Sequence, residues 1–186
     1  MTVLTPANQL TLVRVLLIPV FVILVVYHYF GWALAAFVTA GVTDALDGLI
    51  ARRTGNRSTI GAWLDPVADK LLLVTTFVVL TLPGLGLLNR IPIWLTVLVI
   101  TRDVLIVVTV AIINLAVGPR TFRPSIFGKA TTVVHVVMCV VILYENWLEQ
   151  TSLWVGVWIY AALAITLVSG FHYLFNATRL INTAKP

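Results

Sequence analysis

The chain has few charged residues and a single cysteine. Charged residues make up 10% of its 186 residues, and cysteine occurs once, as Cys139. A lone cysteine can form neither an internal disulfide nor a cysteine metal site. The low charge accompanies a hydrophobic content of 60% and a mean hydropathy of +1.05, far outside the balance of a soluble domain. We therefore interpret the chain as a membrane protein with little room for a soluble domain.

Six apolar runs are long enough to cross the membrane, since a helix needs about 20 residues to span about 30 Å of hydrocarbon. They cover residues 10–28, 32–52, 62–82, 91–117, 129–148 and 152–177. No basic region precedes the first run and Arg14 lies inside it, so we expect a retained helix and not a cleaved signal. The sequence predicts an all-α membrane protein, with six transmembrane helices in one bundle and a single domain over residues 1–186.

Basic residues lie almost entirely on one side of these predicted spans. Eight of them fall in the connections after the second and fourth spans and in the C-terminal tail, namely Arg52, Arg53, Arg57, Arg120, Arg123, Lys129, Arg179 and Lys185. The opposite connections hold Arg90. The positive-inside rule then predicts a multi-pass protein of the cytoplasmic membrane with both termini in the cytoplasm. The basic face would attract anionic lipid headgroups and anionic substrates. Its few basic residues form too narrow a surface to indicate nucleic acid as a partner.

Acidic residues are rarer still, and most of them lie where charge is costly. The chain has seven, and all five of its aspartates fall within predicted spans: Asp44, Asp47, Asp65, Asp69 and Asp103. A charge in the middle of a span costs about 2.5 to 3.5 kcal/mol on insertion scales, so these carboxylates need partners or a water-filled cavity. For Asp103, a salt bridge with the adjacent Arg102 explains the residue as well as a functional role does.

The other four aspartates form two pairs at helical spacing. Asp44 and Asp47 are three residues apart, and Asp65 and Asp69 are four apart, so each pair shares one face of a helix. Two antiparallel helices joined by a short loop can direct all four carboxylates to one point, where divalent cations would balance their charge. Oxygen ligands without nearby His or Cys favour Mg²⁺ or Mn²⁺. We expect two divalent ions at these aspartates, with salt bridges to Arg14 and Lys70 as the structural alternative.

The aspartates belong to a longer motif, which reads Asp44-x2-Asp47-Gly48-x2-Ala51-Arg52-x8-Gly61-x3-Asp65-x3-Asp69. It resembles the signature of the CDP-alcohol phosphatidyltransferase family without a departure, and the six-span topology of that family covers nearly the whole chain. Gly48 and Ala51 would let a nucleotide approach the helix backbone, although small residues also serve close helix packing. Arg52 could bind a diphosphate oxygen or anchor the interface.

The resemblance implies the reaction and the residue roles. The acceptor hydroxyl would attack the phosphorus that bears the diacylglycerol of CDP-diacylglycerol, and CMP would leave without a covalent enzyme intermediate. By analogy all four aspartates bind the metals, Asp69 is the general base, and Asp65 belongs to the catalytic centre. The residues expected to border CDP are Asn8, Asp44, Gly48, Ala51, Arg52 and Gly61. A homodimer is expected from the family alone.

The acceptor follows from weaker signals. Residues 8–14, followed by Pro19, resemble the opening of phosphatidylglycerophosphate synthases and of the related cardiolipin synthases, which indicates a glycerol-type acceptor. Synthesis of phosphatidylglycerophosphate is the commoner of the two reactions, which favours glycerol 3-phosphate as the acceptor. The pair Arg102-Asp103 instead resembles cardiolipin synthases and favours phosphatidylglycerol. Both acceptors carry a phosphate, around which we place Arg102, Arg120 and Lys129.

A membrane protein of another class could also use intramembrane carboxylates. An ion or proton transporter lines a cavity with them, often between inverted repeats. Here the aspartates gather toward the cytoplasmic ends of the second and third spans, beside Arg52, and no inverted repeat is found. A catalytically silent relative would be expected to lose a motif aspartate, and none is lost. We therefore favour the enzyme.

Overall fold

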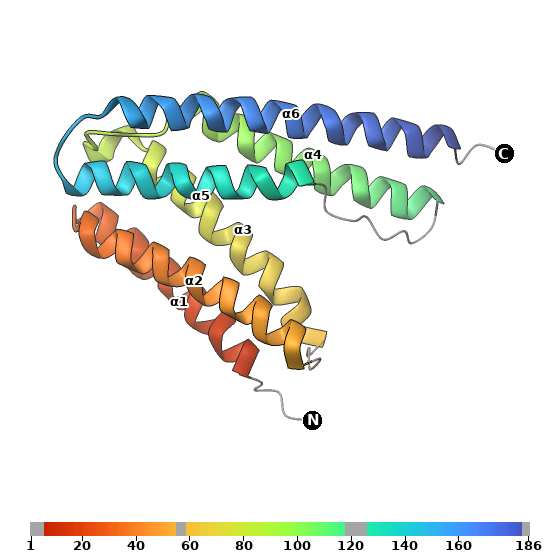
Figure 1. Ribbon diagram of the computed structural model, residues 1–186, viewed down its shortest axis with the longest axis horizontal. Helices are drawn as coiled ribbons and strands as arrows, with labels where there is room; N and C mark the ends of the chain where they lie inside the picture. Colours follow the sequence, from red (N-terminus) through yellow and green to blue (C-terminus); the bar gives the residue numbers. More distant parts are fainter. Residues whose placement is uncertain (1–5, 55–58, 118–125, 184–186) are drawn as a thin grey trace. The chain divides into compact units, whose positions relative to one another are not determined.

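The computed structural model describes the backbone of residues 6–54, 59–117 and 126–183 and the side chains of residues 13–43, 70–112, 115, 126–176 and 178. Within these residues there are six α-helices, one short 3-10 helix at Pro83–Leu85 and no strand. The helices are α1 (Pro6–Val26), α2 (Phe30–Thr54), α3 (Thr59–Thr81), α4 (Ile93–Val117), α5 (Ile126–Trp147) and α6 (Leu153–Thr183) (Figure 1). The prediction of an all-α chain is confirmed, and each apolar run corresponds to one helix.

Three helices carry segments that are long and apolar enough to cross a membrane. These are Ile93–Ile112 in α4, Ile126–Trp147 in α5 and Leu153–Asn176 in α6. In α1, α2 and α3 the described side chains form shorter apolar segments, Val13–Val26, Phe30–Thr43 and Lys70–Thr81. Three predicted spans are thus confirmed by length and composition, and the other three stay predictions.

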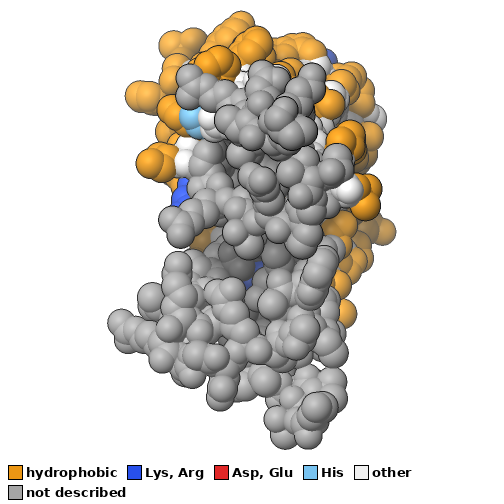
Figure 2. All heavy atoms as spheres, turned by 90° about the vertical axis from the view of Figure 1, so that its right-hand side faces the viewer, with side chains coloured by type: hydrophobic (Ala, Val, Ile, Leu, Met, Phe, Trp, Pro, Cys, Tyr) orange, Lys and Arg blue, Asp and Glu red, His pale blue; other side chains and the backbone are white. Residues whose placement is uncertain are grey.

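Hydrophobic side chains are exposed along these helices. They cover most of the described surface in the view of Figure 2. Leu115, Ile126 and Leu153 are each more than four-fifths exposed, at 88%, 84% and 91%. A soluble protein rarely exposes apolar surface on this scale. These side chains are therefore suited to contact with lipid.

The chain divides into two compact units. The first unit contains α1, α2, α3 and the part of α5 from Cys139 onward, and the second contains α4, the start of α5 and α6. The helix α5 therefore contributes residues to both units.

In the first unit, α1 packs against both α2 and α3. A three-residue turn at 27–29 joins α1 to α2 as an antiparallel hairpin, in which His28 adopts a left-handed φ of 61°. The two helices run side by side (Figure 1). The ring of Phe21 on α1 lies 5.9 Å from that of Phe37 on α2, and this contact sets the register of the hairpin.

Two asparagines tie the segment after α3 to the end of α5 in this unit. The side-chain oxygen of Asn146 accepts from the backbone N–H of Asn89 (3.1 Å), and its Nδ2 donates to the carbonyl oxygens of Asn89 and Ile142 (2.8 Å each). The side chain of Asn89 in turn donates to the carbonyl of Gln150 (2.8 Å). Asn146 is 2% exposed, so water cannot replace these bonds.

Asn146→Ala is therefore expected to destabilise the protein. It leaves the backbone N–H and C=O of Asn89 buried without their partner, which costs about 2 to 4 kcal/mol in total. Thermal unfolding in detergent should show a midpoint several degrees lower than wild type. Asn176→Ala, which removes an exposed amide from α6, should leave the midpoint unchanged, and an equal loss in both variants would contradict the prediction.

In the second unit, α4 packs against α6, and α5 is bonded to α6 through a buried histidine. The Nε2 of His135 lies 2.9 Å from the hydroxyl of Thr166, and that hydroxyl donates its only proton to the carbonyl of Ala162 (2.6 Å). The hydroxyl must therefore accept from His135, which carries a proton on Nε2. This packing role agrees with the absence of any histidine from the predicted metal site.

Candidate active site

The motif residues lie on two consecutive helices of the first unit. Helix α2 carries positions 44 to 52 of the motif, and α3 carries positions 61 to 69. The predicted succession of helix, short connection and helix is confirmed for the described backbone. The following side chains lie outside the described ones, so their roles stay predictions: Asn8, Asp44, Asp47, Gly48, Ala51, Arg52, Gly61, Asp65 and Asp69.

The buried residues of α2 lie at a helical spacing that can be compared with the positions of the first aspartate pair. Ala33, Phe37 and Ala40 are buried, with at most 3% exposed. Their spacings of four and three residues mark one face of a helix. Positions 44 and 47 extend the same series by four and then three residues. Positions 44 and 47 therefore share a helix face with these three buried residues.

Helix α3 repeats this arrangement. Leu72, Thr76 and Val79 are buried, at 6%, 0% and 6% exposure, again at spacings of four and three. Counting back from Leu72 by three and then four residues reaches positions 69 and 65. Both aspartate pairs thus fall at helical spacing from buried residues of their own helix.

The two pairs also lie at matching heights above the connection between their helices. Asp44 is ten residues before the end of α2 at Thr54, and Asp69 is ten residues after the start of α3 at Thr59. Asp47 and Asp65 are seven and six residues from the same ends. Because a helix rises about 1.5 Å per residue, the paired positions lie at nearly the same distance from the end of α2 and from the start of α3.

Of the three residues predicted to hold the acceptor phosphate, the two that the structure describes belong to the second unit. Lys129 lies on the first turn of α5 and is exposed. Arg120 lies outside the described residues. Arg102 lies in the middle of α4, and its contacts are described in full.

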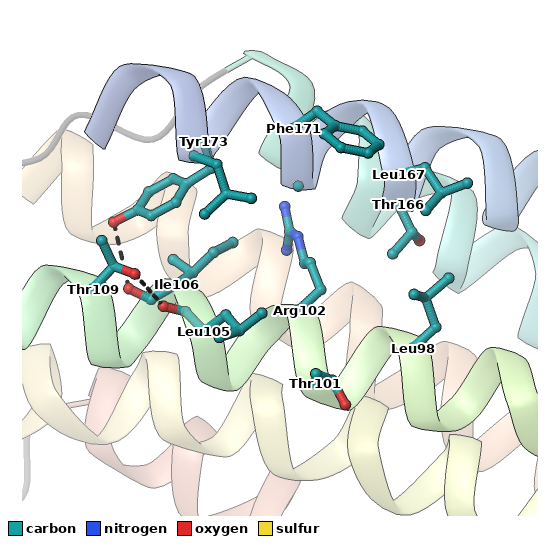
Figure 3. A pocket seen from close by; sticks show the side chains of 12 residues that line it. Leu98, Thr101, Arg102, Leu105, Ile106, Thr109, Thr166, Leu167, Phe171 and Tyr173 are labelled. Carbon is teal, nitrogen blue, oxygen red and sulfur yellow. Dashed lines mark hydrogen bonds between the residues drawn. The ribbon is translucent and has the colours of Figure 1, made fainter. Parts of the chain in front are cut away.

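The guanidinium of Arg102 is held by two partners. Its Nη1 lies 2.8 Å from the Oδ1 of Asp103, and the two side chains are 14% and 19% exposed. Its Nη2 donates to the hydroxyl of Ser169 on α6. Figure 3 shows the Arg102 side chain reaching from α4 toward α6. The salt bridge that the sequence left open for Asp103 is therefore present, whereas nothing in the sequence singled out Ser169.

Arg102 also lines a pocket between α4 and α6 that no motif indicated (Figure 3). The pocket has a volume of about 170 Å³, and most of its wall is apolar. The apolar side chains include Leu98, Leu105 and Ile106 of α4 and Leu167, Phe171 and Leu174 of α6. The hydroxyl of Tyr173 donates to the carbonyl of Ile106 (3.4 Å) at one end. A pocket of this size and polarity, built on two membrane-spanning segments, suits hydrocarbon.

These features define a helical membrane protein in which two consecutive helices carry the positions of the paired aspartates. Residues 4–168 match the family model of the CDP-alcohol phosphatidyltransferases, and the chain belongs to this family. The resemblance read from the motif is confirmed. The chain is an integral membrane enzyme of phospholipid biosynthesis, a CDP-diacylglycerol-dependent phosphatidyltransferase, and the transporter alternative is not supported.

Relatives from two branches of the family are similar to the chain over most of its length. A probable phosphatidylglycerophosphate synthase of Mycobacterium tuberculosis is 34% identical over 184 residues, which cover 93% of this chain and 81% of that one. The human cardiolipin synthase (CMP-forming) is 33% identical over 97% of this chain and 64% of its own. The Streptomyces coelicolor cardiolipin synthase (CMP-forming) is 31% identical over 96% of this chain and 85% of its own. These identities leave both acceptors in consideration.

Proposed function

We propose that the enzyme transfers the phosphatidyl group of CDP-diacylglycerol to glycerol 3-phosphate, which gives phosphatidylglycerophosphate and CMP. The observation that carries the proposal is the complete aspartate motif, whose positions lie on the consecutive helices α2 and α3. The likeness of residues 8–14 to the glycerol branch and the similarity to a probable phosphatidylglycerophosphate synthase support the acceptor.

In the proposed reaction, the chain's own residues orient the substrates and move one proton. Gly48, Ala51 and Gly61 leave room for the CDP moiety beside the helix backbone, and Asn8, Asp44 and Arg52 contact it. The acceptor hydroxyl attacks the phosphorus that bears the diacylglycerol as the bond to the CMP oxygen breaks. Asp69 accepts the hydroxyl proton.

The donor set fits divalent cations. Four carboxylates carry a charge of minus four, which two divalent ions balance, and oxygen-only ligation suits Mg²⁺ or Mn²⁺. We assign Asp44, Asp47, Asp65 and Asp69 as the residues that hold them. When bound, such ions stabilise the negative charge on the diphosphate.

We further propose that all six helices span the cytoplasmic membrane in a single domain, with both termini and the active site facing the cytoplasm. Helices α1, α2 and α3 have 21, 25 and 23 residues, and at about 1.5 Å per residue each reaches across about 30 Å of hydrocarbon. The eight basic residues on one side support the orientation. A homodimer remains an expectation from the family.

A second candidate acceptor, phosphatidylglycerol, is favoured by the pocket between α4 and α6. Its apolar wall suits the acyl chain that phosphatidylglycerol has and glycerol 3-phosphate lacks. Arg102 itself lines this pocket, and the Nε of its guanidinium is buried and makes no hydrogen bond to any described group. The pair Arg102-Asp103 and two relatives named cardiolipin synthase point the same way. For either acceptor, we place Arg102, Arg120 and Lys129 around its phosphate.

The two acceptors are separated by a product assay. The purified enzyme is incubated with CDP-diacylglycerol and Mg²⁺ or Mn²⁺, and in parallel with glycerol 3-phosphate, phosphatidylglycerol, inositol phosphate or serine, and the lipid products are identified by mass spectrometry. Phosphatidylglycerophosphate together with CMP is the expected result. Cardiolipin would establish the second candidate instead, and no product from either glycerol-type acceptor with folded protein would contradict the proposed function.

A further inference from the structure

Arg14 is a fully buried charge in the first unit. Its side chain is 0% exposed, and it shares a face of α1 with Phe21 and Val25, which are also 0% exposed. The spacings of seven and four residues between these three positions are those of a single buried stripe. An arginine is almost never buried this deeply unless an anionic group lies close to it.

The register of the α1–α2 hairpin places Arg14 beside the motif. Phe21 faces Phe37, with ring centres 5.9 Å apart. Seven residues back along α1 from Phe21 is Arg14, and seven residues forward along the antiparallel α2 from Phe37 is Asp44. Both positions continue the buried faces through which the two helices meet, so Arg14 and Asp44 lie at the same height.

The second aspartate pair lies on the other helix that contacts α1. Helix α1 packs against α3 as well as α2, and Asp69 has the same distance from the α2–α3 connection as Asp44. The remaining acids are placed elsewhere. Asp103 pairs with Arg102 in the second unit, and Glu145 and Glu149 flank the asparagine that bonds to Asn89, beyond the far end of α3.

We propose that Arg14 is a built-in counter-charge of the aspartate cluster. In the metal-free protein its guanidinium offsets part of the charge of minus four on α2 and α3, so that the helices remain packed before metal binds. In the loaded protein the same cation opposes the bound ions, which lowers their affinity and keeps them exchangeable. Arg14 is thus a positioning residue that acts through the carboxylates. This inference rests on the proposed metal site.

The test compares stability and metal binding in wild type, Arg14→Gln and Arg14→Lys. Thermal unfolding is measured in detergent with and without Mn²⁺, and Mn²⁺ binding is followed by the electron paramagnetic resonance signal of the free ion. Arg14→Gln should unfold at a lower temperature without metal, recover most of the difference with Mn²⁺, and bind Mn²⁺ at least about tenfold more tightly. Arg14→Lys should resemble wild type, as should Arg90→Gln, which removes an exposed cation of the same unit.

The alternatives give distinct results. If Arg14 only fills space, Arg14→Gln lowers the unfolding temperature equally with and without Mn²⁺ and leaves the Mn²⁺ affinity unchanged, which would overturn the inference alone. If wild type binds no Mn²⁺, the proposed metal site fails together with the inference. Should Arg14→Gln not fold, the double variant with Asp44→Asn should fold without metal, because the cation and one carboxylate are removed together; a double variant that also fails to fold would overturn the inference.

Discussion

Asp65→Asn is expected to abolish phosphatidyl transfer while the protein stays folded. Asparagine has the shape of aspartate but carries no charge, so it removes a metal ligand from a position that continues the buried face of α3. We expect kcat/KM to fall by at least about a thousandfold, and Asp44→Asn should behave in the same way. Activity is measured as CMP release, and folding as the thermal unfolding midpoint in the same detergent.

A matched control separates this loss from a general effect of removing a carboxylate. Glu149→Gln is the same chemical change at an exposed position between α5 and α6, and it should keep wild-type activity. If Asp65→Asn retained activity within about tenfold of wild type, a difference of about 1.4 kcal/mol in transition-state stabilisation, the assignment of Asp65 as a metal ligand would be wrong.

Removal of divalent ions should stop the reaction in the unmodified enzyme. The four carboxylates of the motif cannot stabilise further negative charge on a diphosphate by themselves. With excess chelator, transfer should fall below detection, and added Mg²⁺ or Mn²⁺ in excess of the chelator should restore it.

The control for this experiment is a measurement of folding in the presence of the chelator. Circular dichroism in chelator should retain the helical signal, because the six described helices are held by apolar packing and by bonds such as that of Asn146 to Asn89. Full transfer in chelator would remove the two-metal proposal and leave the family assignment intact.

The helices could be predicted from the sequence because each one coincides with an apolar run. Their ends could not, since hydropathy measures the ability to enter lipid and not the ability to form a helix. Helix α1 begins at Pro6, four residues before the predicted start, where proline is favoured in the first turn of a helix. Helix α6 continues to Thr183 because the residues after the apolar run are polar but compatible with a helix.

The aspartate motif was readable because its residues are close in sequence. Contacts between distant segments were not: Ser169 gave no signal among apolar neighbours, yet it accepts from Arg102, 67 residues away. The pocket between α4 and α6 depends on the same long-range pairing. For Asp103, the sequence offered two explanations, and the observed ion pair shows that one of them is realised. For Arg14, the sequence offered a salt bridge to the aspartates as the structural alternative, and the structure adds that its side chain is fully buried.

Because helix α5 contributes to both units, neither unit of this enzyme can be cut out as one piece of sequence. The chain leaves the first unit at α4, returns to it in the second half of α5, and leaves again at α6. Neither unit is therefore a contiguous stretch of sequence. A fragment that encodes one unit complete must also encode part of the other, so the aspartate-bearing unit cannot be expressed as a single contiguous segment without residues of the second unit.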